Sequence, residues 1–317
     1  MKSTYDVMDD KINILCSIDA VYDRHLLTML ASLFENNKDE SFRIFLVGQK
    51  LSVMQIDTIK GFVNKYGSEL VYIEADERLL EGLPEFKFDF ISIIAYIRCF
   101  MTEYIPIDIH KIIYLDCDLV VLRPIRPLWE TNVDDVAVAV VEDMWAMQGA
   151  GERLGYDDSV YSYFNSGVML VNLDYWRSYK VTDRVTDFLD ENREKLLFAD
   201  QDILNGIFYD KKKWLSPQYN MQDGFYRRRR RKMSLELQNE VDKYLATPVI
   251  LHYTGSHKPW QFKCYHPLKN EYAKYRKMIP YAEEKPKFVF KDWLEMKVNG
   301  LLYSLRLLKR KYRVIKK

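Results

Sequence analysis

The chain has 317 residues with 47 basic and 46 acidic side chains, so its net charge is only +1, and 48% of its residues are hydrophobic. This balance is typical of a globular protein with a large core, and it excludes a disordered chain or a basic protein that coats nucleic acid. The sequence lacks the run of roughly 18 apolar residues that spans a bilayer and the apolar region of a signal peptide. Its four cysteines are scattered, which favours reduced thiols in a cytosolic protein.

Strands and helices are predicted to alternate through the first hundred residues, beginning with an apolar strand that ends at Asp19. Such alternation predicts a parallel sheet with helices on its faces, which binds ligands at the carboxyl ends of its strands. The predicted strands cover residues 12–19, 42–47 and 70–73, and the predicted helices cover residues 23–35, 53–66 and 91–104.

Residues 111–122 predict a buried strand that contains two carboxylates, Asp116 and Asp118. Unpaired carboxylates in apolar surroundings are costly and two like charges cannot neutralise each other, so a divalent cation is the expected partner. The alternative is a pair of acids where the strand meets a solvated loop. In a parallel sheet, Asp116 should open onto the same crevice as Asp19.

The second half also predicts an α/β pattern, with strands over residues 136–141, 164–173 and 249–253 and a helix over 183–192. His252 lies in the last strand and is the candidate third ligand, because imidazole with carboxylates suits Mn²⁺ as well as Mg²⁺. Gly255 allows a ligand to approach the backbone closely, and Lys258 supplies a positive charge that can pair with a phosphate. The alternatives are a hydrogen-bonded core histidine and a solvated lysine.

Two unequal parts are predicted, because no flexible linker interrupts residues 1–275 and the composition changes over residues 276–317. From Phe290 onward, apolar residues recur on one helical face, and the last twelve residues hold seven basic side chains and no acid. This pattern favours a basic amphipathic helix that binds an anionic membrane surface. The alternative is a helix that packs on the domain.

The densest basic run extends from Tyr226 to Lys232 and includes the five arginines 227–231. Such a run is usually a solvated loop, although here it could border the side of a cleft where a phosphorylated or lipid-borne sugar would bind. Because no module of stacking aromatic residues accompanies it, we expect no nucleic-acid partner.

Four segments, residues 114–122, 164–172, 200–202 and 252–260, resemble in order the motifs of the family 8 retaining glycosyltransferases. That family includes glycogenin and the bacterial lipopolysaccharide galactosyl- and glucosyltransferases, and the resemblance extends over residues 14–267. It implies an α/β protein of the GT-A fold, with a Rossmann-like, mostly parallel sheet flanked by helices and a catalytic domain over residues 1–275. The donor it implies is UDP-glucose or UDP-galactose.

The same resemblance implies roles for individual residues. It places Mn²⁺, with Mg²⁺ as an alternative, on Asp116, Asp118 and His252. It implies catalytic roles for Gln201, Asp202, Asp200 and Lys258. Donor contacts are implied for Asp19, Tyr22, Arg98, Asp116, Cys117, Asp118, Asn165, Ser166, Asp200, Gln201, Gly255 and Lys258.

A nucleotide diphosphate leaving group needs its developing charge stabilised, which a divalent ion, Lys258 and Arg98 can do without a protonated general acid. Retention of anomeric configuration is implied by the resemblance. Gln201 is a poor nucleophile, so attack by the acceptor hydroxyl on the front face is favoured over a covalent intermediate at Gln201 or Asp202.

The basic tail favours a glycan or lipid-linked acceptor of bacterial lipopolysaccharide, lipooligosaccharide or capsule, and a cytoplasmic protein held peripherally at the inner face of the plasma membrane. It disfavours a self-glucosylating, glycogenin-like role.

Two alternatives remain open. Residues 116–120 also fit the pattern of haloacid dehalogenase-type phosphatases, in which the first aspartate attacks phosphorus. The chain could also be a sugar-nucleotide binder without turnover.

Overall fold

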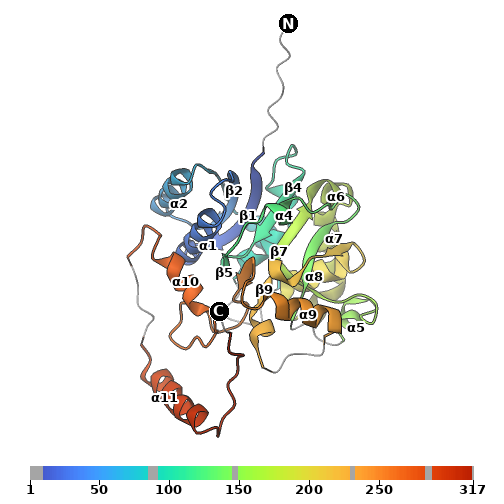
Figure 1. Cartoon of the computed structure of the whole chain (residues 1–317). Helices are drawn as coiled ribbons and strands as arrows, with labels where there is room; N and C mark the ends of the chain where they lie inside the picture. The colour runs from blue at the N-terminus through green and yellow to red at the C-terminus, as the bar shows by residue number, and fades with distance from the viewer. Residues whose placement is uncertain (1–9, 85–91, 145–148, 229–232, 283–287, 316–317) are drawn as a thin grey trace.

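The computed structural model describes residues 10–84, 92–144, 149–228, 233–282 and 288–315. Figure 1 shows a central sheet surrounded by helices, with the last long helix standing apart from the main body. Within these described ranges, no helix is both long and apolar enough to cross a bilayer.

The central sheet has seven strands in the order β3-β2-β1-β4-β7-β6-β8. Its strand pairs are parallel except those made by β7, which runs antiparallel to both β4 and β6. The expected α/β architecture with a mostly parallel sheet is therefore confirmed. The strands are β1 (Ile12–Asp19), β2 (Phe42–Gln49), β3 (Glu69–Glu74), β4 (Lys111–Leu115), β6 (Val138–Glu142), β7 (Phe164–Asn172) and β8 (Lys212–Trp214).

Successive side chains of a strand point to opposite faces of the sheet. The apolar side chains of the inner strands therefore divide between two cores, one on each face. In β1, Ile14 and Cys16 join the core covered by the helices α1 (Asp23–Glu35), α2 (Val53–Lys65) and α10 (Lys269–Arg276). Leu15 joins the core covered by η1 (Ile93–Cys99), α7 (Val181–Asn192) and α8 (Ala199–Phe208). In β2, Ile44 and Phe45 divide in the same way. Both faces of the sheet are thus covered, and its strand ends remain available for ligands.

The first two helices, α1 and α2, begin and end within one residue of their predicted positions. Ser52 and Gln55 form a reciprocal capping box that fixes the start of α2. The helices of four or more residues are α1 (Asp23–Glu35), α2 (Val53–Lys65), α3 (Glu77–Leu80), η1 (Ile93–Cys99), α4 (Arg126–Trp129), α5 (Ala150–Leu154), α6 (Leu173–Ser178), α7 (Val181–Asn192), α8 (Ala199–Phe208), η5 (Asp223–Tyr226), α9 (Leu235–Tyr244), α10 (Lys269–Arg276) and α11 (Phe290–Ser304).

Two predicted elements are wrong in detail. The helix expected over residues 91–104 consists of two 3₁₀ segments, η1 and Met101–Glu103 (η2), while residue 91 lies outside the described residues. The segment η1 contains three β-branched isoleucines, Ile93, Ile94 and Ile97, which have a lower α-helical propensity than unbranched residues. The strand expected over residues 111–122 is broken between Leu115 and Leu119, because its two halves belong to different sheets.

The second sheet has three short strands in the order β5-β10-β9. Its central strand, β10, pairs antiparallel with β5 and parallel with β9. The strands are β5 (Leu119–Val121), β9 (Met221–Gln222) and β10 (Ile250–His252). This small sheet brings residues 250–252 beside the break that follows β4.

The carboxy-terminal helix is present, but it ends at Ser304, before the seven basic side chains of the last twelve residues. Arg306 adopts a left-handed backbone conformation (φ 60°), which ends the helix. No residue of α11 is buried. The chain then returns to the domain, where Tyr312 is buried and pairs with Arg227 in an antiparallel bridge (Figure 1).

Candidate functional site

The Asp116-Cys117-Asp118 turn lies at the junction between the two sheets, after β4 and before β5. The Asp116 amide donates to the Gly167 carbonyl oxygen at 2.9 Å, which fixes the turn against β7. The neighbouring strands also end here, so the turn opens into a pocket of about 420 Å³. The break in the predicted strand is therefore what exposes the two carboxylates.

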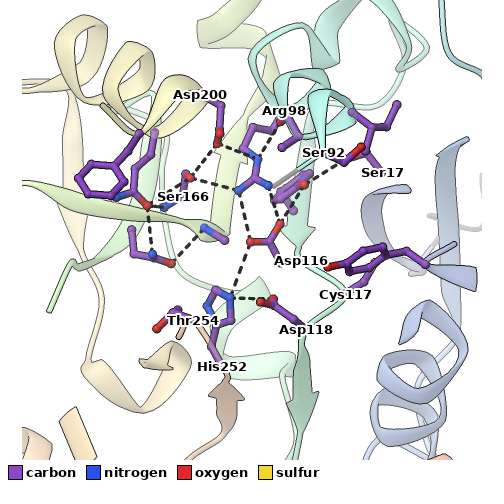
Figure 2. A pocket seen from close by; sticks show the side chains of 18 of the residues that line it. Ser17, Ser92, Arg98, Asp116, Cys117, Asp118, Ser166, Asp200, His252 and Thr254 are labelled. Carbon is purple, nitrogen blue, oxygen red and sulfur yellow. Dashed lines mark hydrogen bonds and ion pairs between the residues drawn. The ribbon is translucent and has the colours of Figure 1, made fainter. Parts of the chain in front are cut away.

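His252 reaches this turn from the second sheet, because it pairs with Leu119 in the antiparallel β5–β10 register. Its Nε2 lies 3.0 Å from Asp118 Oδ1 and 3.7 Å from Asp116 Oδ2, as Figure 2 shows. Its Nδ1 lies 2.9 Å from the side-chain oxygen of buried Asn220. When Nδ1 donates to that oxygen, Nε2 presents its lone pair to the carboxylates, as a metal-ligating imidazole requires.

Three further observations fit a divalent cation at this position. One ligand atom from each of Asp116, Asp118 and His252 lies within 4.8 Å of the others. A Cβ atom on Gly167 would come within 2.3 Å of the His252 ring and 2.4 Å of Asp116 Oδ2, so only glycine leaves the ligands this close. The Thr254 hydroxyl lines the same pocket and is buried without a hydrogen-bond partner among the residues that the structure describes. Oxygen and imidazole ligands in this arrangement suit Mn²⁺ or Mg²⁺.

Two basic side chains compensate the carboxylates. Lys258 Nζ lies 2.5 Å from Asp118 Oδ2, and Arg98 Nη2 lies 2.7 Å from Asp116 Oδ1. Burial raises the pKa of the Asp118 carboxyl, but the interactions with Lys258 and His252 outweigh burial and hold that pKa well below its usual range. Both basic groups are thus positioned to meet an anionic ligand that lies on the carboxylate pair.

Arg98 also connects the pair to a third carboxylate. Its Nε lies 3.1 Å from Asp200 Oδ2, and its Nη1 donates to Ser166 Oγ at 3.1 Å. The Ser166 hydroxyl in turn donates to Asp200 Oδ2 at 3.1 Å (Figure 2). Burial raises the pKa of Asp200 to about 6, against the opposing charge of Arg98. The guanidinium is therefore fixed in one orientation at the centre of the site.

Gln201 lines the same pocket as Asp118, within a network of amides. Its Oε1 accepts from Asn165 Nδ2 and from the Ser166 amide, both at 3.1 Å. Its Nε2 donates to Asp143 Oδ2 at 3.3 Å, and Asn165 donates to the same oxygen at 3.0 Å. Such a set of buried donors and acceptors is suited to the hydroxyl groups of a sugar.

Most of the predicted site residues line this one pocket, although they come from distant segments of the chain. Tyr22 lines the pocket, and its ring lies edge-to-face with that of Trp260, with the ring centroids 6.2 Å apart. The predicted residues that line the pocket are Asp19, Tyr22, Arg98, Asp116, Cys117, Asp118, Asn165, Ser166, Asp200, Gln201, His252 and Lys258.

Asp202 and Gly255 are the two predicted residues that do not line the pocket. Asp202 is completely buried behind it, where its carboxylate binds Arg153 at 2.7 Å. A direct catalytic role for Asp202 does not fit this placement. Gly255 lies beside pocket-lining Thr254, with its backbone against the carboxylate of Asp223.

Sequence reasoning missed three residues that shape the site. Asp143 directly follows β6, and an acid at the end of a strand was the signal that could have identified it. Tyr163 lines the pocket from the turn before β7. Asn220 supports His252 from a short irregular segment, and no pattern in the sequence indicates that role.

The chain is similar to proteins of known class over most of its length. The family model of glycosyl transferase family 8 matches residues 13–264. The chain is 31% identical to a lipopolysaccharide 1,2-glucosyltransferase of Escherichia coli over 79% of its own length and 74% of the relative. It is 29% identical to general stress protein A of Bacillus subtilis, covering 84% of this chain and 93% of that one.

A solved structure of the galactosyltransferase LgtC, in complex with donor and acceptor sugar analogues, has the same fold. It superposes with a TM-score of 0.78 at 24% identity, covering 86% of this chain and 98% of LgtC. The expected GT-A fold is thus confirmed, and the phosphatase alternative is set aside. Because the family model covers most of the sequence, the chain belongs to glycosyltransferase family 8.

Proposed function

We propose that the protein is a retaining, Mn²⁺-dependent hexosyltransferase that moves glucose or galactose from a UDP-sugar to a hydroxyl group of an acceptor glycan. The observation that carries this proposal is the convergence of Asp116, Asp118 and His252 beside Lys258 and Arg98. Three metal-ligating groups and two cations in one pocket suit a nucleotide diphosphate better than a neutral ligand. The family assignment supports the same reaction class.

Each group has a defined task in this proposal. Asp116, Asp118 and His252 would hold the divalent ion, which supplies Lewis-acid stabilisation of the diphosphate when it is bound. Lys258 and Arg98 stabilise the negative charge that develops on the leaving UDP. Because both are already oriented by carboxylates, little reorganisation is needed when that charge appears.

In this proposal Asp143, Asn165 and Gln201, which line the same pocket, bind hydroxyl groups of the donor sugar or the acceptor. We propose front-face attack, in which the acceptor oxygen bonds to the anomeric carbon as the bond to the phosphate oxygen breaks. The departing phosphate oxygen takes the acceptor proton. Gln201 is too poor a nucleophile for a covalent intermediate, and the Asp202 carboxylate is already bound to Arg153 and Tyr163.

The proposed acceptor is a lipid-linked glycan of bacterial lipopolysaccharide, lipooligosaccharide or capsule, at the cytoplasmic face of the plasma membrane. Two observations support this choice: the similarity to a lipopolysaccharide glucosyltransferase, and the exposed apolar and basic residues of the tail. Trp293, Leu294 and Leu301 on α11 are all more than a third exposed. We propose that this helix binds an anionic membrane surface.

A donor screen tests the proposed activity. Release of UDP from a panel of UDP-sugars with Mn²⁺ should occur with UDP-glucose or UDP-galactose. Replacing Lys258 by alanine should lower kcat about a hundredfold, because it removes a cation that stabilises the leaving group. Lys60→Ala, at an exposed position on α2, is the matched control and should leave kcat unchanged.

Absence of UDP release from every donor would instead identify a sugar-nucleotide binder without turnover. An unchanged kcat with a raised donor KM in Lys258→Ala would mean that Lys258 only binds the ground state.

A further inference from the structure

The loop that carries Lys258 rests on a buried carboxylate that has no place in the reaction described above. This loop, residues 254–258, follows β10, and Asp223 follows β9. Because β9 and β10 are parallel neighbours, with Gln222 paired to His252, their ends meet at the same edge of the small sheet. The sheet register thus places Asp223 beside the loop.

The contact between Asp223 and the loop is close. A Cβ atom on Gly255 would lie 3.2 Å from both Cγ and Oδ2 of Asp223, so the carboxylate packs directly against the Gly255 backbone. Asp223 is only 3% exposed. A buried carboxylate of this kind requires donors that compensate its charge. The groups that donate hydrogen bonds to Asp223 therefore help to hold residues 254–258 in place.

One of the donors comes from the far end of the chain. Arg227 Nε and Nη2 donate to Asp223 Oδ2 at 2.9 and 2.8 Å, and the Tyr312 hydroxyl donates to Asp223 Oδ1 at 2.7 Å. The Tyr312 ring lies 5.5 Å from the Arg227 guanidinium and 5.8 Å from the ring of His266. Tyr312 is therefore packed as well as hydrogen-bonded.

Residues 311–313, here named the strap, are also held by their backbone. The Arg228 amide donates to the Lys311 carbonyl oxygen at 3.0 Å, and the Arg313 amide donates to the Tyr226 carbonyl oxygen at 2.9 Å. The Arg313 side chain adds an ion pair of 2.6 Å with Asp242 on α9. These contacts attach the strap to the domain on both sides of Tyr312.

We propose that the strap positions the diphosphate-binding loop: Tyr312, through Asp223, holds residues 254–258 in the conformation that presents Thr254 and Lys258 to the pocket. Tyr312 is a positioning residue, since it acts through Asp223. This inference rests on the proposed function, because it takes the loop to bind the UDP diphosphate. It gives the tail a role in donor binding beside the proposed role of α11 at a membrane.

The test compares Tyr312→Phe with the wild-type chain, because this change removes the hydroxyl and keeps the ring. Hydrogen exchange should become faster at the amides of residues 254–258 and stay unchanged in β1. Binding of UDP with Mn²⁺, measured by calorimetry, should weaken about fivefold, as expected for one hydrogen bond. Tyr303→Phe removes a hydroxyl from α11 on the same tail and should match the wild type in both readouts.

Asp223→Asn tests the same link from the other side with no loss of volume and should give the same pattern. The proposal is overturned if both variants exchange residues 254–258 at the wild-type rate, or if UDP affinity is unchanged in both. If the wild-type chain itself does not bind UDP, the proposed function fails, and the exchange of residues 254–258 then decides the strap's role by itself.

Discussion

The carboxylate of Asp202 accepts five hydrogen bonds: two from Arg153, one from the Tyr163 hydroxyl and two from the backbone amides of Leu197 and Phe198. These amides belong to the turn that leads into α8. The next residue, Ala199, has a left-handed backbone (φ 40°), which is unfavourable for any residue other than glycine. Asp202 therefore stabilises a strained turn.

That turn places Asp200 and Gln201 in the pocket, so the effect of Asp202 on the site is indirect. Asp202→Asn should lower the free energy of unfolding by about 3 kcal/mol, since it leaves the Arg153 charge without its buried partner. Urea unfolding measures this loss. In the double variant with Arg153→Gln, the loss should be smaller than the sum of the single losses.

A chemical role for Asp202 would produce the reverse result. Turnover would then be lost in Asp202→Asn while the urea midpoint stayed at the wild-type value.

At the scale of elements, the sequence predicted most of the described strands, but among the described α-helices it predicted only α1, α2, α7 and α11. It also missed how two of the strands meet. The apolar run over residues 111–122 reads as one strand because nothing in it marks the change of sheet after Leu115. Only the pairing of β5 with β10, some 130 residues later in the chain, shows that the run divides. Long-range pairing of this kind is not encoded in local periodicity.

Helix α8 was missed for a related reason. Its first turn contains Asp200 and Asp202, whose buried carboxylates are explained by Arg98 and Arg153 from other elements. A short helix with buried acids shows no clean amphipathic pattern. The motif at residues 200–202 was nevertheless recognisable from its sequence. Its place in the site could therefore be predicted, although its secondary structure could not.

The tail helix α11 presents its apolar side chains to solvent, with Leu294 47% and Leu301 60% exposed. If it binds an anionic membrane surface, the double variant Leu294→Ser, Leu301→Ser should bind phosphatidylglycerol vesicles at least about tenfold more weakly, because two buried leucines are lost. Vesicle sedimentation measures this. Substitution is preferable to truncation before α11, which would also remove Tyr312 from Asp223.

Val53→Ser on α2, where the side chain is 74% exposed, is the matched control and should leave vesicle binding unchanged. Equal sedimentation of the double variant and the wild type would mean that α11 is not the membrane-binding element.

At the scale of the whole molecule, the site exists because two sheets meet. The first supplies Asp116 at the end of β4, and the second supplies His252 at the end of β10. The sequence predicted both proposed ligands from their chemistry and from family resemblance, but it could not predict the supporting residues Asn220 and Asp143. Their roles depend on hydrogen bonds between segments that lie more than twenty residues apart in the chain.

The binding of Mn²⁺ in the presence of UDP tests the central claim most directly. Calorimetric titration should show one tight Mn²⁺ per wild-type chain, and Asp118→Asn should weaken that binding at least about a hundredfold, because it removes a charged ligand. Asp57→Asn, at an exposed position on α2, should bind as the wild type does. A folded Asp118→Asn variant that binds Mn²⁺ with wild-type affinity would contradict the account.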